Sequence, residues 1–312
     1  MNFPDTKIFK YRYDYESQPL VDFLSNRYRI KISKDKDILE DRVFINGQQT
    51  SSESIIKSGD VLEYVHHRAD EKSIPLNFET LYEDEYIIAI SKPDFLPVIP
   101  SNQFYFNSLV IKAKEYFSNP DLTPLHRLDI ETSGILLFGK TKASRKLFQL
   151  LFQNQKITKY YQAITYRKIK AKIISGTLYT TPYSDIYTKY FLDSSGPDSS
   201  TTRIIKQCCW GKYHRVWCQP ITGKTNQIRA HFSAIGSPIV GDKKYYFDES
   251  IYLDWYLNRD FKRIEQKMKL ERQALHCYQL VFDHPVTSNN ITIQDNNVLW
   301  QKKIDTLLTP NH

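Results

Sequence analysis

Hydrophobic and polar residues alternate with the two-residue period of β-strands along much of the chain after residue 78. This period predicts strands in ETLYEDEYIIAISKP (79–93), KYYQAITY (159–166), YHRVWCQPI (213–221) and LHCYQLVFDHP (275–285), and ILLFGK (135–140) is predicted as a buried strand. The alternation CCWGKYHRVWC (208–218) is typical of a β-hairpin.

Apolar residues at helical spacing predict fewer helices, in SLVIKAKEYFS (108–118), NQIRAHFSAI (226–235) and DWYLNRDFKRIEQKMKLERQ (254–273). In KASRKLFQLLFQNQ (142–155), Leu147, Leu150 and Leu151 predict an amphipathic helix with a basic face. Because strands outnumber helices and short turns join most of them, we expect an α+β fold with a mixed, largely antiparallel sheet.

The first 70 residues predict a small α/β module of their own. QPLVDFLSNRY (18–28) reads as a short helix, and VFINGQQ (43–49) and KSGDVLEYV (57–65) read as strands around an Asn46-Gly47 turn. This order resembles the small RNA-binding module of the S-four type. Its helical part is short, so a degenerate module that mainly packs on its neighbour stays an alternative. ADEKSIPLN (69–77) is predicted as the linker to a catalytic domain at residues 76–308.

Composition adds limits to this picture. Hydrophobic residues form 41% and charged residues 25% of the 312 positions, as in folded proteins, and disordered or collagen-like chains are excluded. No apolar segment approaches the roughly 18 residues that span a bilayer, and the first residues lack the apolar core of a secretion signal. The four cysteines are too few for a disulfide framework and Cys208, Cys209, His214 and Cys218 match no familiar zinc spacing, so we expect a cytoplasmic protein without a membrane partner.

The net charge of +8 is distributed unevenly. Residues 1–75 contain 12 basic and 13 acidic residues, whereas residues 76–312 contain 31 and 22. The 53 residues from Thr132 to Ser184 contain ten basic and no acidic side chains, interleaved with aromatic ones. Such a segment is often only a solvated face, but its length and single sign favour contact with a polyanion such as RNA.

Two short stretches contain the candidate chemistry. In PLHRLDIETSGILLFGK (124–140), Asp129 precedes a buried strand, where a carboxylate can act as base, nucleophile or metal ligand, or simply cap a turn. In ITGKTNQIRAHFSAIGSPIVGDKKYY (221–246), the guanidinium of Arg229 could orient Asp129 or form a purely structural ion pair.

These stretches, with LYEDEYIIAISKP (81–93), KYYQA (159–163) and the final LHxxxLxFxHP pattern, resemble in order and spacing the RluA-type family of pseudouridine synthases over about residues 76–290. The resemblance implies the pseudouridine synthase fold and the isomerisation of uridine in ribosomal or transfer RNA without a cofactor or metal. It places the catalytic carboxylate at Asp129, the stacking aromatic ring at Tyr161 and the partner arginine at Arg229. Arg127 is the candidate to brace the space that a flipped-out uridine leaves, or to contact a phosphate.

The sequence departs from the family pattern at several points. Lys224 and Asn226 replace the usual Arg and His, so Lys224 can bind substrate only as a point charge and Asn226 cannot titrate. The regions 181–202 and 247–270 also differ from the family pattern. Two other functions stay open from the residues alone: an RNA-binding protein without catalysis, and a glycoside hydrolase that pairs Asp121 with Asp129.

Overall fold

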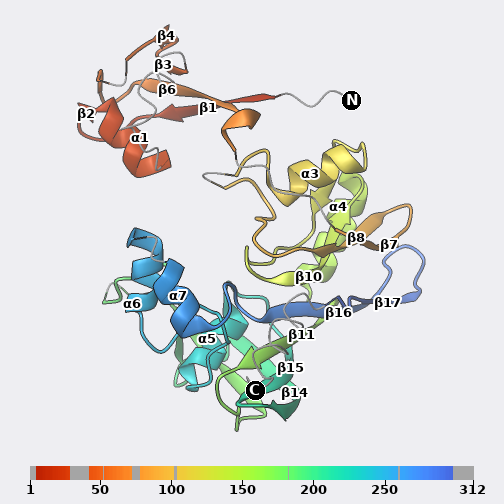
Figure 1. Ribbon diagram of the computed structural model, residues 1–312. Helices are drawn as coiled ribbons and strands as arrows, with labels where there is room; N and C mark the ends of the chain where they lie inside the picture. Colours follow the sequence, from red (N-terminus) through yellow and green to blue (C-terminus); the bar gives the residue numbers. More distant parts are fainter. Residues whose placement is uncertain are drawn as a thin grey trace, which may run out of the picture. The chain divides into compact units, whose positions relative to one another are not determined.

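The structure, a computed structural model, describes residues 5–28, 42–51, 53–71, 78–101, 104–181, 183–258 and 261–297 (Figure 1). The chain divides into two units. Unit 1 comprises Met1–Pro75 together with Ile99–Ser118, and unit 2 comprises Leu76–Val98 together with Asn119–His312. The identification of the first unit as an S-four-like module, and of residues 76–308 as the catalytic domain, stays a prediction.

Unit 1 is built around a small antiparallel sheet. Its strands follow the order β1 (Thr6–Arg12), β6 (Val61–His67), β3 (Val43–Ile45) and β4 (Gln48–Gln49), and β2 (Gln18–Pro19) pairs separately with β5 (Ile55–Ile56). Helix α1 (Leu20–Tyr28) supplies part of one apolar cluster, which contains Tyr13, Leu20, Phe23, Leu24, Val43, Ile56, Leu62 and Tyr64. Figure 1 shows these elements in red and orange.

The predicted helix and strands of this unit are confirmed. Asn46 and Gly47 form the turn between β3 and β4 with φ angles of 54° and 79°, which an Asn-Gly pair accommodates easily. Strand β1 was not predicted, although its side chains alternate in exposure, with Phe9 and Tyr11 partly buried and Lys10 and Arg12 exposed. Residues 29–41, between α1 and β3, lie outside the described residues.

The predicted linker at residues 69–77 begins with structure of its own. After a 3₁₀ turn, η1 (Arg68–Asp70), the buried carboxylate of Glu71 accepts hydrogen bonds from the backbone N–H groups of residues 105–107 at 2.6 to 2.8 Å. These residues precede α3 (Leu109–Tyr116), so Glu71 fixes the entry to that helix within unit 1. Residues 72–77 lie outside the described part of the chain.

Unit 2 is built on one large sheet, and the α+β prediction is confirmed. The strand order is β13 (Phe191–Asp193), β12 (Ile173–Tyr179), β14 (Ser200–Trp210), β15 (Tyr213–Pro220), β11 (Thr158–Thr165), β16 (Leu275–Asp283), β10 (Ser133–Gly139), β8 (Ile87–Lys92) and β7 (Thr80–Glu83). In addition, β17 (Asn290–Gln294) pairs with β16 and β9 (Thr123–Pro124) pairs with β10. Strands β14 and β15 form the predicted hairpin.

The sheet is antiparallel except where β10 meets β16. This parallel junction includes only Ser133 paired with His276 and Gly134 paired with Cys277. Gly134 has a φ of 110°, and a Cβ there would lie 2.2 Å from the backbone oxygen of Cys277. The junction therefore requires glycine, and it places the start of β10 at the centre of the sheet.

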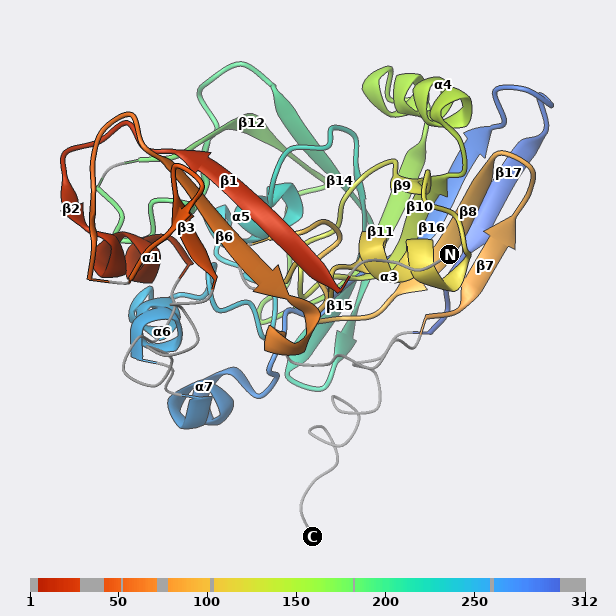
Figure 2. The ribbon, with the colours of Figure 1, turned by 90° about the horizontal axis from the view of Figure 1, so that it is seen from above.

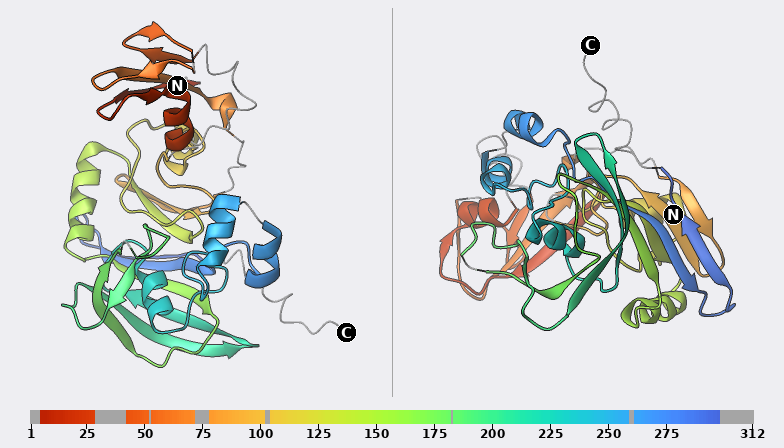
Figure 3. Two further views of the ribbon diagram at one scale, coloured as in Figure 1. Left: turned by 90° about the vertical axis from the view of Figure 1, so that its left-hand side faces the viewer. Right: turned by 90° about the horizontal axis from the view of Figure 1, so that it is seen from below.

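Helices cover parts of this sheet. Helix α4 (Lys142–Gln153) packs against β10, and α5 (Gln227–Ala234) packs against the end that contains β12, β13 and β14 (Figures 2 and 3). Within the described part of the chain, no helix is both long and apolar enough to cross a bilayer.

Two helix predictions need correction. The helix expected at 254–273 is not continuous: this range contains a π-helical turn (Asp254–Asn258) that follows α6 (Ser250–Leu253), then α7 (Phe261–Met268), and it is irregular from residue 269 to β16. In α4 the buried side chains are Ser144 and Phe148, whereas Leu147 and Leu150 are exposed. The helix face that packs against β10 therefore differs from the face that the leucine spacing suggested.

Candidate active site

Asp129 lies in the turn that leads into the buried strand β10. Its backbone oxygen accepts a hydrogen bond of 3.0 Å from the N–H group of Thr132, which closes the turn. Upstream, Nε2 of His126 accepts a 3.1 Å bond from the backbone of Leu137 and anchors the preceding segment to β10. The carboxylate of Asp129 is therefore held at the mouth of a strand, and its side chain is 26% exposed.

Buried polar side chains bind the backbone and the Glu131 side chain of this turn. The fully buried ammonium of Lys92 donates to the carbonyl oxygens of Pro93, Ile130 and Thr132 at 2.7, 3.0 and 2.9 Å. Arg272 donates to the carbonyl oxygen of Glu131, while Lys243 forms a 2.6 Å ion pair with the Glu131 carboxylate. Because successive residues of the turn are bonded in this way, the backbone that carries Asp129 has little freedom.

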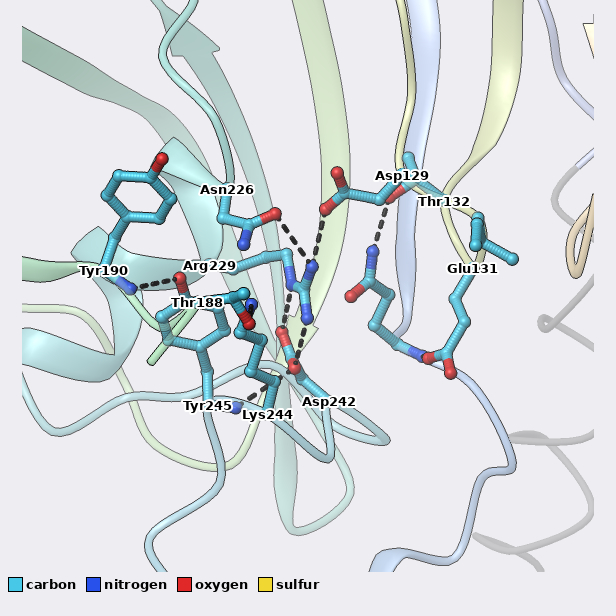
Figure 4. A network of polar contacts seen from close by, with 12 residues as sticks. Asp129, Glu131, Thr132, Thr188, Tyr190, Asn226, Arg229, Asp242, Lys244 and Tyr245 are labelled. Atoms are coloured by element: carbon cyan, nitrogen blue, oxygen red, sulfur yellow. Dashed lines mark hydrogen bonds and ion pairs between the residues drawn. The ribbon is translucent and has the colours of Figure 1, made fainter. Parts of the chain in front are cut away.

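Arg229, in the first turn of α5, binds two carboxylates (Figure 4). Its Nη1 donates to Oδ2 of Asp129 at 2.6 Å, and its Nε and Nη2 form a bidentate pair with Asp242 at 2.7 and 2.9 Å. Burial by itself would lower the pKa of Arg229, but Asp242 and then Asp129 raise it well above the usual value. The guanidinium also lies over the ring of Tyr245, 5.0 Å from its centroid.

The second oxygen of Asp129, Oδ1, is turned away from Arg229 in Figure 4. Within the described residues, it has no hydrogen-bond partner. Arg229 thus orients the carboxylate through one oxygen and leaves the other available for chemistry.

Asn226 occupies the position before α5, with a φ of 54°, a conformation that Asn adopts more readily than most residues. Its Oδ1 accepts a 3.1 Å bond from Nη1 of Arg229. The departure from the family's usual His therefore keeps a polar contact to the arginine. Nearby, Lys224 is exposed and supplies a charge at the rim.

Tyr161 enters the site from the central strand β11, where the register shifts between Tyr160 and Tyr161. Its side chain is buried, and Tyr161 pairs with Cys277 of the neighbouring strand β16 in the register of the sheet. Burial raises the pKa of Tyr161 well above its usual value, and Cys277 and Asp129 raise it further. The phenol is therefore a buried, neutral ring.

These residues line one pocket with about 510 Å³ of empty space, which includes space open to solvent. All five residues singled out from the sequence belong to its lining, namely Arg127, Asp129, Tyr161, Lys224 and Arg229. Arg127 and Lys224 are exposed, whereas Tyr161 is buried. Asp121, the second carboxylate of the hydrolase alternative, is exposed and is not among the lining residues.

Sequence reasoning assigned no role to two residues that shape the site. Asp242 lies in the quoted Gly241-Asp242 pair, but nothing in the sequence showed that it holds Arg229 through two hydrogen bonds. The glycine before Asp242 is a sequence sign of this tight turn, because the φ of 80° at Gly241 and the backbone of Arg272 exclude a side chain there. Lys159 lines the pocket two residues before Tyr161, in the same strand motif.

Comparison with known proteins gives a consistent picture. Residues 86–234 match the family model for RNA pseudouridylate synthases. The ribosomal large subunit pseudouridine synthase D of Buchnera aphidicola subsp. Schizaphis graminum is 33% identical over 276 residues, which cover 81% of each chain. The dual-specificity RNA pseudouridine synthase RluA of Haemophilus influenzae is 26% identical over 69% of this chain and 90% of its own.

Solved structures show the same fold. The human RNA pseudouridylate synthase domain containing 4 matches with a TM-score of 0.55 and 22% identity, over 74% of this chain and 94% of its own. Taken with the Asp129–Arg229 pocket and the extent of the Buchnera match, these findings identify the chain as a member of the RluA-type family of RNA pseudouridine synthases.

Proposed function

We propose that Asp129 is the catalytic carboxylate with which this enzyme isomerises uridine to pseudouridine in RNA. The observation that supports it best is the ion pair to Arg229, which fixes one carboxylate oxygen and leaves Oδ1 without a partner among the described residues of the pocket. A purely structural Asp would be expected to use both oxygens, as Asp242 does in its bidentate pair.

The reaction requires one reactive group and an enclosed place for the detached base. The bond between N1 of uracil and C1′ of ribose breaks, and a bond between C5 and C1′ forms. C5 loses its proton, and N1 gains one. A carboxylate can support this by attacking C1′, by attacking C6 of the base, or by removing a sugar proton. The ring of Tyr161 offers a face on which uracil can stack while it turns.

RNA contact is assigned to the cations around the pocket. A uridine stacked in a helix is out of reach, so it must flip into the site. Arg127 and Lys224 are exposed at the rim, where the backbone of a flipped nucleotide stays, and Arg127 is the candidate to brace the vacated position. We infer that the target is a uridine in ribosomal or transfer RNA, the two classes that the names of relatives include.

A cytoplasmic location is part of the proposal. It is supported by the four free cysteines, of which Cys208 and Cys209 are exposed, a state that fits a reducing compartment.

Tritium release from RNA labelled at C5 of uracil tests the activity, because C5 loses its hydrogen when the new bond forms. We expect release on ribosomal or transfer RNA prepared from cells that lack the protein, and none on RNA that has already been modified. If RNA binds but releases no tritium on any cellular fraction, the protein is an RNA-binding member of the fold without catalysis, and the proposal is wrong.

A further inference from the structure

We propose that Lys159 contacts a carbonyl oxygen of the flipped uracil and offsets the negative charge that the base acquires when it leaves the ribose. This inference rests on the proposed active site at Asp129. Lys159 lies near the start of β11, two residues before Tyr161, and both side chains line the pocket. No role for it was predicted from the sequence.

The space around the ammonium group of Lys159 is kept open. A Cβ built on Gly223 would lie 3.2 Å from Nζ of Lys159, closer than most carbon contacts. Gly223 also lines the pocket, in the loop that leads to α5. The φ of Gly223 is outside the left-handed region, so the backbone conformation does not require glycine there. The missing side chain instead leaves space in the pocket. The glycine thus leaves room beside Nζ for a ligand.

Lys159 has no anionic partner within the described residues. No ion pair or hydrogen bond of its side chain occurs there, although Asp129 lines the same pocket. Burial lowers the pKa of Lys159, and only the Cys277 thiol among its neighbours raises it. A partly buried cation without a counterion weakens the folded state, so its presence in the pocket suggests that the missing partner arrives with the substrate.

The neighbours of Lys159 point to the base and not to a phosphate. Its charge acts on His126, whose pKa burial and then Lys159 lower to about 3, and on the buried Cys277, which pairs with Tyr161 across the sheet. The side chain of Lys159 lines the same pocket as the ring of Tyr161. The exposed cations Arg127 and Lys224, by contrast, are at the rim, where phosphates remain.

The chemistry gives this cation a task. When the N1–C1′ bond breaks, its electron pair stays on uracil and is delocalised onto O2 and O4. An ammonium that donates to either oxygen stabilises this anion before C5 bonds to C1′ and the C5 proton is lost. A donor at an oxygen where charge develops typically contributes roughly 10²–10³ in rate.

The variant Lys159→Met keeps the length of the side chain and removes its charge. We expect kcat for pseudouridine formation to fall about 100-fold, while the melting temperature stays the same or rises because an unpaired buried charge is removed. Lys57→Met, at an exposed position of unit 1, is the control and should change neither quantity. A Lys159→Met enzyme with wild-type kcat would overturn the inference, and an inactive wild-type enzyme would instead refute the proposed function.

Binding separates contact to the base from contact to a phosphate. In an Asp129→Asn background, which prevents turnover, Lys159→Met should weaken binding to RNA with uridine at the target position. Binding to the same RNA with an abasic target nucleotide should not change. An equal loss on both RNAs would assign Lys159 to the sugar-phosphate backbone, and no loss on either would remove it from substrate contact. Both outcomes contradict the proposal.

Discussion

Arg229 donates three hydrogen bonds to two carboxylates and divides them unequally. Asp242 is fully buried and takes two hydrogen bonds, while Asp129 takes one and keeps partial exposure. The arginine is therefore fixed by Asp242 and in turn orients Asp129. Loss of Asp242 would leave a buried guanidinium half paired, whereas loss of the Asp129 charge leaves the bidentate pair intact.

Lys92 allows a test of the support beneath the Asp129 turn. Burial lowers the pKa of Lys92 to about 7, well below the value near 10.5 of an unfolded chain. Between pH 7 and 10 the unfolded state therefore binds more protons at this group than the folded state does. The contribution of Lys92 to the free energy of unfolding should increase with pH, by up to about 1.4 kcal/mol for each pH unit.

Denaturant titrations of wild type and Lys92→Met at pH 7, 8, 9 and 10 measure this contribution. The difference between their free energies of unfolding removes the effects of other titrating groups. We expect this difference to shift in favour of the wild type as the pH rises. A difference that stays constant over this range would show that Lys92 keeps its proton throughout, fully bound to its three carbonyl acceptors.

Among the elements, the parallel junction of β10 and β16 is highly sensitive to substitution at Gly134. Gly134→Ala would place a Cβ 2.2 Å from the Cys277 carbonyl at a φ of 110°. We expect it to lower the free energy of unfolding by about 3 kcal/mol or more. Gly47→Ala is the control, because it also has a positive φ of 79° but nothing within 4 Å, and it should cost about 1 kcal/mol. Equal losses in thermal or urea unfolding would contradict this account.

The strands and the pocket were the most predictable parts of this protein. The two-residue period located the predicted strands of the sheet. The family resemblance singled out Asp129, Tyr161 and Arg229, and all three line one pocket in the structure. Helix boundaries were less predictable where packing decides them. The leucine spacing of α4 suggested a face that β10 does not cover, and the 254–273 pattern contains a π-helical turn. Nor could local sequence show that Asp242, thirteen residues after Arg229, holds it.

At the scale of the whole molecule, the charge surplus belongs to residues 76–312, with 31 basic against 22 acidic side chains. The exposed lysines Lys168 and Lys170 lie in its acid-free segment, after β11. We expect the Lys168→Gln/Lys170→Gln double variant to reduce the slope of log affinity for RNA against log salt. The reduction should be roughly 0.7 to 0.9 for each phosphate that these lysines neutralise in the wild type.

The matched control is Lys10→Gln/Lys57→Gln, which removes the same number of charges from unit 1. Its salt slope should equal that of the wild type. A larger change in this control than in the unit 2 variant would assign the main electrostatic contact with RNA to the N-terminal unit.

The central claim is that Asp129 carries the chemistry while the surrounding cations bind the RNA. The most direct measurement is pseudouridine formation by Asp129→Asn, quantified by mass spectrometry of the RNA, beside its affinity for the same RNA. We predict a rate loss of at least about 1000-fold with an affinity close to that of the wild type. An Asp129→Asn enzyme that forms pseudouridine at the wild-type rate would contradict the account.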